Sequence, residues 1–221
     1  TAFGTHPGRA FISGVLRDLR DRSALHIDDN ELRALQTFAR RIRGEIFFAS
    51  RWMIVEGQAE YLIVSALAKS LGYDFDEYGV SLIDAVNNGN PATFAALARA
   101  LSIPFLAVFD GDHAGNTYCD TIRNRGFEPA FVTDRCKTLP NGNLEQQLLA
   151  DGLEAELRSV LQELGQADAL VIDLAALEKR LDGSKTAYAA ALSNRIATDP
   201  ALAQRMPQAF RDAIGRLRGL V

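Results

Sequence analysis

Residues 105–112 of this chain are Phe105-Leu106-Ala107-Val108-Phe109-Asp110-Gly111-Asp112, and residues 52–57 repeat the design as Trp52-Met53-Ile54-Val55-Glu56-Gly57. Each stretch begins with four or five consecutive apolar residues, the pattern of a short strand that is buried on both faces. Each then changes abruptly to acidic residues and glycine, where a strand ends and the chain turns. The sequence therefore predicts two buried strands that each deliver carboxylates at their carboxyl end.

Helical patterns alternate with these strands. A helix is expected over 58–71, a strand over 80–83, a helix from the turn at 87–91 through Leu101, a helix over 114–125 and a strand over 130–132. Such alternation implies right-handed crossovers and an α/β fold with a doubly wound, mainly parallel sheet. Ligands of these sheets bind at the carboxyl ends of the strands. Glu56 and Asp110 should therefore meet at one edge.

Three regions follow from the changes in pattern along the chain. Apolar residues at helical spacing, interleaved with Arg40, Arg41 and Arg43, predict a helix that leads into the first strand. After Lys137 the pattern is helical over 144–164, 169–181 and 184–196, so a flanking helical domain is expected. The predicted regions are a helical lead-in at 1–50, the sheet domain at 51–138 and the helical domain at 139–221.

Net charge, cysteine content and apolar runs exclude some classes of protein but do not identify the function. The formal net charge of -4 leaves 24 Lys and Arg for local basic patches, so it neither supports nor excludes DNA as a partner. Cys119 and Cys136 match neither a disulfide framework nor a zinc ligand set, and we expect them to be thiols in the cytoplasm. No apolar run is long enough to cross a bilayer, and no secretory signal is present, so no membrane partner is expected.

The acidic residues carry the chemistry that the sequence predicts. Carboxylates crowded at one sheet edge repel one another and need a compensating cation, and their hard oxygen atoms suit Mg²⁺ or Mn²⁺. Glu60 lies one helical turn beyond Glu56 and can face the same site. Asp110 and Asp112 could instead cap a helix, since Asp is favoured there. The same pattern following an earlier strand favours the metal site.

A strand ending in Glu-Gly, followed by another ending in Asp-x-Asp-x-x-Gly, resembles the Toprim domain of topoisomerases, bacterial primases, recombination mediators and OLD (overcoming lysogenization defect) nucleases. Phe47-Phe48-Ala49 ahead of the first strand, and Glu60 four residues after Glu56, are most similar to the OLD nucleases. The Toprim resemblance covers residues 52–132. It implies a Toprim-like fold and a metal-dependent DNA endonuclease.

The resemblance also implies roles for individual residues. Two divalent ions, Mg²⁺ or Mn²⁺, are expected on Glu56, Glu60, Asp110, Asp112 and an acid from the helical domain, which corresponds to Glu145. Glu56 and a basic group corresponding to Lys185 are expected to be catalytic, with Arg180 as the alternative for the basic role. OLD nucleases carry an ATPase domain ahead of the Toprim region, so that domain of the parent protein is expected outside residues 1–221.

Other functions of a Toprim domain remain open at this point. A primase-like nucleotidyl transferase would use the same acids, but it normally needs a zinc-binding module for which the cysteines are lacking. A topoisomerase needs a catalytic tyrosine on another domain. A non-catalytic DNA-binding module of the recombination-mediator type would be expected to have an incomplete acidic set, whereas the Glu and both Asp residues are present here.

Overall fold

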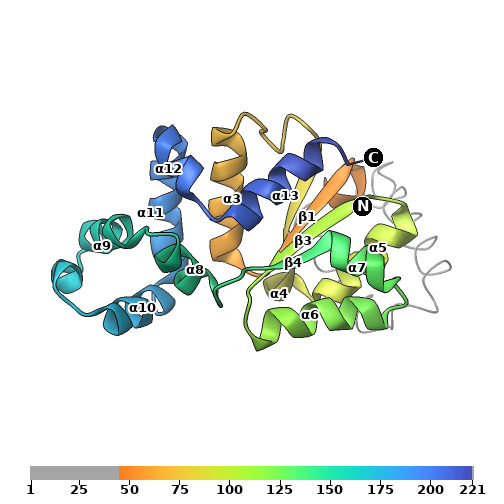
Figure 1. Cartoon of the computed structure of the whole chain (residues 1–221). Coiled ribbons are helices and arrows are strands. Elements are labelled where there is room, and N and C mark those ends of the chain that lie inside the picture. Colours follow the sequence, from red (N-terminus) through yellow and green to blue (C-terminus); the bar gives the residue numbers. More distant parts are fainter. Residues whose placement is uncertain (1–44, 221) are drawn as a thin grey trace, which may run out of the picture.

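The computed structural model describes residues 45–220, and these build a four-stranded parallel sheet flanked by helices (Figure 1). The strands are β1 (Arg51–Val55), β2 (Val80–Asp84), β3 (Phe105–Phe109) and β4 (Cys136–Thr138), in the order β2-β1-β3-β4. In the register, Val55 pairs with Asp84 and Val108, and Phe109 pairs with Thr138. All four carboxyl ends therefore lie at one edge.

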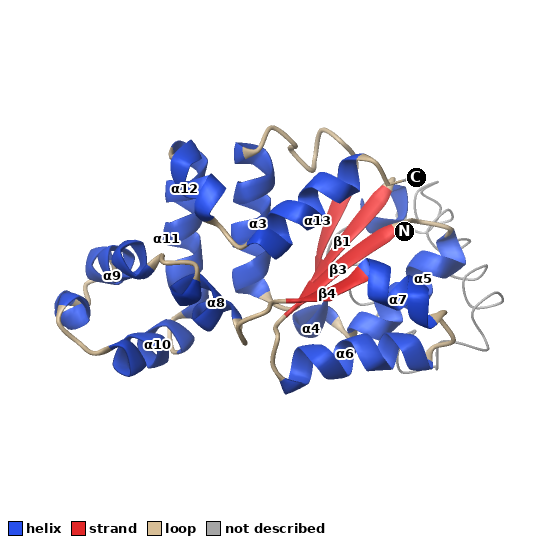
Figure 2. Cartoon of the chain, in the orientation of Figure 1, coloured by secondary structure: helices blue, strands red, loops and turns tan. Residues whose placement is uncertain are grey.

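Helices cover both faces of this sheet (Figure 2). Met53 and Val55 of β1 belong to a core with α3 (Gln58–Ser70) and α13 (Gln208–Arg218). Trp52 and Ile54 point the other way, into a second core with α5 (Pro91–Leu101), α6 (His113–Asn124) and α7 (Pro129–Arg135). Successive side chains of a strand point to opposite faces, so the four apolar residues 52–55 of β1 contribute to both cores. The predicted α/β Toprim fold with a doubly wound parallel sheet is confirmed.

The remaining C-terminal helices lie on the far side of α3 from the sheet (Figure 1). α11 (Lys185–Thr198) packs along α3, and Tyr188 and Leu192 of α11 belong to the core that contains Met53 and Val55. The rest of this layer consists of α8 (Leu144–Ala150), α9 (Glu154–Glu163), η3 (Ala167–Leu170), α10 (Leu174–Asp182) and α12 (Pro200–Arg205). This packing brings the amino ends of α8 and α11 toward the carboxyl edge of the sheet.

The structure corrects three local predictions. The strand predicted at 130–132 is wrong, because these residues lie in α7, which has Pro129 at its start, and β4 follows at Cys136–Thr138. A short apolar run fits a buried strand or one face of a helix equally well, and proline at the first helical position favours the helix. The single helix predicted at 144–164 is interrupted at Gly152, whose φ of 76° few other residues adopt. The helix predicted from residue 169 begins at Leu174, because Asp173 caps it.

The other predicted elements are found within a few residues of their expected limits, including β1, β2, β3, α3, α5, α6 and α11. The lead-in helix is described only from Glu45, where the short η2 (Glu45–Phe48) lies, so Arg40, Arg41 and Arg43 are outside the described residues. Within residues 45–220 no helix is both long and apolar enough to span a membrane.

Candidate active site

The two acidic loops predicted from the sequence meet at the carboxyl edge of the sheet. Glu56 follows β1 and Asp110 follows β3, and the backbone N–H of Asp110 donates a hydrogen bond of 3.1 Å to Oε2 of Glu56. Burial raises the pKa of Glu56, the bond from Asp110 lowers it, the charge of Asp112 raises it and that of Lys185 lowers it, with a net upward shift. The pKa of Glu56 thus depends on charges from two other segments of the chain, the loop after β3 and the start of α11.

Glu60 lies in the first turn of α3, and its side chain is buried against the same edge. Its Oε2 accepts a hydrogen bond of 2.9 Å from the N–H of Gly57, which closes the start of the helix. Burial, together with the charges of Glu145 and Glu56, raises the pKa of Glu60 to about 7. The helical spacing correctly placed Glu60 beside Glu56.

Asp110 is the most strongly perturbed acid of the group. Its side chain is buried, and Oδ1 has no hydrogen-bond partner. Burial and the charges of Glu60, Glu56, Glu145 and Asp112, in decreasing order, raise the pKa of Asp110 to about 8. This carboxylate therefore lies in a place where its negative charge is not compensated by the described residues alone.

Asp112 lies at the exposed rim of the site. Its Oδ1 accepts a hydrogen bond of 3.0 Å from the N–H of Gly115, so Asp112 is the N-cap of α6. The capping interpretation of Asp112 is thus confirmed, while its charge also raises the pKa of Glu56 and of Asp110. Since the cap uses one oxygen, the other remains available to a ligand.

Glu145 comes from the helical layer, at the start of α8, and is completely buried. The hydroxyl of Tyr188 in α11 donates a hydrogen bond of 2.8 Å to Oε1 of Glu145, whereas Oε2 has no hydrogen bond. The charge of Glu145 raises the pKa of both Glu60 and Asp110. The structure therefore brings this acid to the cluster that the sheet loops begin.

The two candidates for the basic group lie in different surroundings. Nζ of Lys185 is 3.7 Å from Oε2 of Glu145 and 3.2 Å from Oδ1 of Asp182. Burial lowers the pKa of Lys185, but Glu145, Asp182 and Asp110 outweigh it, with a net upward shift. The guanidinium of Arg180 instead forms hydrogen bonds of 3.0 and 2.7 Å with both carboxylate oxygens of Asp168. Lys185 is electrostatically part of the acidic cluster, and Arg180 is held elsewhere.

Two residues at the site were not singled out from the sequence. Asp84 ends β2 beside Val55, is buried, and accepts hydrogen bonds from the backbone N–H and Nδ2 of Asn87. Its position directly after an apolar strand was a signal that could have identified it. Tyr188 gave no such signal, because only the packing of α11 places its hydroxyl on Glu145.

The cluster is chemically suited to divalent cations. Asp110 Oδ1 and Glu145 Oε2 are buried without hydrogen bonds, and the charges of neighbouring acids raise the pKa of Glu60 and of Asp110. Oxygen donors of this kind are those that Mg²⁺ and Mn²⁺ prefer. Within the described residues no group of three or more His, Cys, Asp or Glu side chains is already arranged to hold a metal ion. It is the chemistry of the donor set, acidic oxygens that are buried and not fully hydrogen-bonded, that fits a divalent cation.

Two glycines allow the Asp110 loop its close contacts. The N–H of Gly111 donates a hydrogen bond of 2.7 Å to the carbonyl of Gly142, and a Cβ on Gly111 would overlap the carbonyl oxygen of Leu139. A Cβ on Gly115 would overlap the carbonyl of Asp110. Both contacts involve backbone atoms, which cannot move aside as a flexible side chain could. A residue larger than glycine at either position therefore requires the backbone to shift.

We expect Gly111→Ala to lower the free energy of unfolding by about 1–3 kcal/mol, because the backbone must move to accommodate the methyl group. Gly215→Ala is the matched control, since nothing lies within 4 Å of its added Cβ in the interior of α13. It should stabilise the protein by about 0.5–1 kcal/mol. Urea unfolding of the three proteins measures both effects, and equal stability of Gly111→Ala and wild type would contradict the tight contact.

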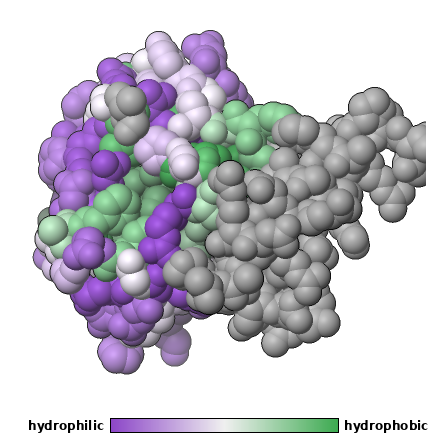
Figure 3. Space-filling view, turned by 90° about the vertical axis from the view of Figure 1, so that its right-hand side faces the viewer, coloured by the Kyte–Doolittle hydropathy of each residue, from purple (hydrophilic) through white to green (hydrophobic). Residues whose placement is uncertain are grey.

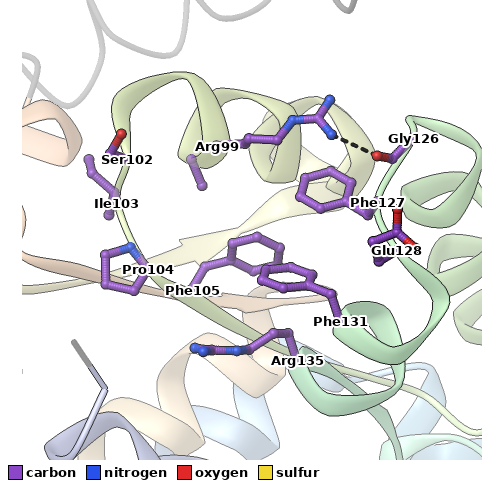
Figure 4. A pocket seen from close by; sticks show the side chains of 11 residues that line it. Arg99, Ser102, Ile103, Pro104, Phe105, Gly126, Phe127, Glu128, Phe131 and Arg135 are labelled. Atoms are coloured by element: carbon purple, nitrogen blue, oxygen red, sulfur yellow. Dashed lines mark hydrogen bonds between the residues drawn. The ribbon is translucent and has the colours of Figure 1, made fainter.

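A separate cavity of about 480 Å³ lies at the opposite end of the sheet, where β3 begins (Figure 4). Phe105, Phe127 and Phe131 line it, and the Arg99 guanidinium lies 4.2 Å from the ring centre of Phe127. Figure 3 views the molecule from the side on which α5 and α7 lie in Figure 1, and there hydrophobic patches lie within a largely hydrophilic coloured surface. This cavity lies away from the acids, which follow the carboxyl ends of the strands.

Comparisons with known proteins agree with the fold. Residues 47–112 match the family model for the Toprim domain of overcoming lysogenization defect protein-like proteins. The uncharacterized protein YbjD of Escherichia coli K12 is 31% identical over 102 residues, which cover 46% of this chain and 18% of YbjD. The match thus spans less than a fifth of that relative's length.

Solved structures show the same arrangement over most of the chain. The C-terminal region of the Burkholderia pseudomallei OLD protein has a TM-score of 0.63 at 19% identity, covering 78% of this chain and 98% of that one. The C-terminal region of the Xanthomonas campestris pv. campestris OLD protein has a TM-score of 0.56 at 24% identity, covering 80% and 99%. At these identities the structural likeness concerns the fold, which extends beyond the sheet into the helical layer.

Proposed function

Because this chain carries the Toprim region of the OLD family, a nuclease-type family, we propose that it is a metal-dependent DNA endonuclease that cleaves phosphodiester bonds at the carboxyl edge of the sheet. Toprim domains generally bind divalent metals. The observation that carries the proposal is the convergence of Glu56, Glu60, Asp110 and Glu145. The charges of Glu56 and Glu145 raise the pKa of both Glu60 and Asp110. Acids whose pKa is perturbed in this way are typical of functional sites.

We assign the binding of two divalent ions, Mg²⁺ or Mn²⁺, to Glu56, Glu60, Asp110, Asp112 and Glu145. When bound, such ions activate a water molecule and stabilise the charge of a phosphodiester under attack. The part of the protein is to hold the oxygen donors in place. The backbone bonds to Glu56, Glu60 and Asp112 fix one oxygen of each, and Tyr188 fixes one of Glu145.

Lys185 is proposed to neutralise negative charge on the phosphate as the bond breaks. Its ammonium group lies beside Glu145 and is partly exposed, so it can reach a substrate at the edge. The raised pKa keeps it positively charged at neutral pH. A fixed positive charge favours a transition state in which negative charge grows.

A larger assembly is also part of the proposal. The solved structures similar to this chain are C-terminal regions of OLD proteins. We infer that residues 1–221 act as the nuclease portion of a longer chain, whose ATPase domain lies outside this sequence.

Incubation with supercoiled plasmid tests the function directly. We expect cleavage in the presence of Mn²⁺ or Mg²⁺ and none in excess EDTA, with activity restored when metal is added back. A buffer with Ca²⁺ alone is a control for effects of charge that do not require catalysis. Cleavage that is undiminished in EDTA would exclude the metal-dependent mechanism. Incorporation of nucleotides without cleavage would support the nucleotidyl transferase alternative.

A further inference from the structure

A groove of about 740 Å³ runs between β4 and α13, on the same side of the sheet as α3. Buried Leu106, Ala107 and Ala213 form its apolar floor. Four cationic side chains line it above this floor, Arg135, Lys137, Arg211 and Arg216. β4 is the edge strand of the sheet, so no further strand closes the groove within the described part of the chain.

The cationic side chains of this groove are held by specific contacts, and acidic residues neutralise only part of their charge. Asp134 binds Arg216 at 2.7 Å and Arg135 at 3.0 Å, so one carboxylate fixes two guanidinium groups. Nζ of Lys137 donates to the carbonyl of Thr133 at 2.6 Å, and Nε of Arg211 donates to the carbonyl of Met206 at 2.9 Å.

These last two contacts are to neutral groups, and among residues 45–220 neither Lys137 nor Arg211 forms an ion pair. Asp212 is the acid that lines the groove itself, and Asp134, beside the lining, pairs with two of the cations. Among the described residues, the four cations are therefore balanced by only these two carboxylates. This local excess is notable in a chain whose net charge is -4.

The groove leads to the acidic site. Thr138 and Pro140 line the end of the groove, and Thr138 pairs with Phe109, which directly precedes Asp110. Paired strands are about 4.8 Å apart, so this end lies one strand spacing from β3, which Asp110 directly follows. The N–H of Leu139 donates to the carbonyl of Phe109 at 2.9 Å and locks the two segments together.

We propose that this groove binds the phosphate backbone of one DNA strand and directs it to the acidic edge of the sheet. The inference rests on the proposed function, because it concerns how the substrate of that site is held. A polyanion is repelled by clustered carboxylates, and a neighbouring basic groove offsets that repulsion. The volume is typical of pockets for drug-sized ligands, so the groove accommodates a short stretch of a single strand. The apolar floor suits sugars and bases, while the cations contact phosphates.

Neutralising Lys137 and Arg211 together tests the groove. The variant Lys137→Gln/Arg211→Gln removes two charges and keeps side chains of similar length. The matched control, Lys69→Gln/Lys179→Gln, removes two charges from exposed lysines that do not line the groove. Binding is measured by fluorescence anisotropy with a labelled single-stranded oligonucleotide in Ca²⁺, over a range of salt concentrations. Plasmid cleavage in Mn²⁺ is measured in parallel.

We expect the groove variant to bind about tenfold more weakly than wild type, and the slope of log K against log salt to become shallower by about 0.7 for each lost phosphate contact. The control variant should match wild type in binding and cleavage. Equal affinity and equal slope for the groove variant and wild type, with cleavage intact, would overturn the proposal that the groove binds DNA. The proposed nuclease function would be unaffected. A wild-type protein that neither binds nor cleaves DNA would overturn both.

Discussion

Asp110→Asn is expected to reduce plasmid cleavage by at least about 10²-fold, since loss of a group that merely supports a metal ligand already costs 10–100-fold. Asparagine keeps the shape of the side chain but removes its charge from the centre of the cluster. The four acids whose charges raise the pKa of Asp110 all lose one repulsive neighbour. The same substitution should therefore impair activity and relieve electrostatic strain in the metal-free protein.

The direction of the pH dependence follows from the raised pKa. Asp110 binds a proton more tightly when folded, with a pKa of about 8, than when unfolded, where a value of about 3.9 applies. The folded state therefore holds more protons between about pH 4 and pH 8, and the stability of the metal-free protein must fall as the pH rises through that window. Glu60, with a pKa of about 7, adds to the same trend.

Thermal melts in EDTA at several pH values measure this effect. At pH 8 Asp110→Asn should be more stable than wild type by on the order of 1–3 kcal/mol, and its loss of stability with rising pH should be shallower. Asp120→Asn is a control on the surface of α6, where the carboxylate is exposed and paired with Arg123. Full cleavage activity of Asp110→Asn, or a metal-free protein less stable than wild type at pH 8, would contradict the assignment.

Lys185→Ala is expected to lower single-turnover cleavage by about 10²-fold, the usual cost of removing a group that stabilises transition-state charge. Arg180→Ala should leave cleavage near that of wild type, because its guanidinium is bound to exposed Asp168. Lys185→Arg retains the positive charge and should recover part of the lost rate. The rates are measured at saturating concentrations of metal and DNA, so that an effect on the chemical step is distinguished from weaker binding.

A different ranking of these variants would be equally informative. A wild-type rate for Lys185→Ala together with a collapse for Arg180→Ala would move the basic role to Arg180. Loss of stability alone is a separate outcome, since Lys185→Ala leaves Glu145 buried without its nearby cation. Urea unfolding of each variant detects that loss, and a rate defect in a fully folded Lys185→Ala is the result that supports the proposal.

The sequence by itself determined the parallel sheet and the two acids that meet at its carboxyl edge. Glu56 and Asp110 directly follow uninterrupted apolar runs, and parallel topology places such residues at one edge whatever the details of packing. Glu60 followed from helical spacing alone. These inferences succeeded because each depends on a periodicity that is local to a few residues.

Only the tertiary structure decided what completes the site and what surrounds it. Glu145 and Tyr188 are 43 residues apart, and their hydrogen bond exists because α8 and α11 contribute to the same hydrophobic core. The tertiary structure also places Lys185 near Glu145 and Arg180 on Asp168, a difference in surroundings that the sequence did not reveal. The basic groove joins the edge strand β4 to α13, and the correct position of β4 was hidden because α7 contains an apolar run that also fits a strand. Contacts between distant segments depend on how whole faces of helices and sheets bury one another, and a local pattern does not specify the partner of each face.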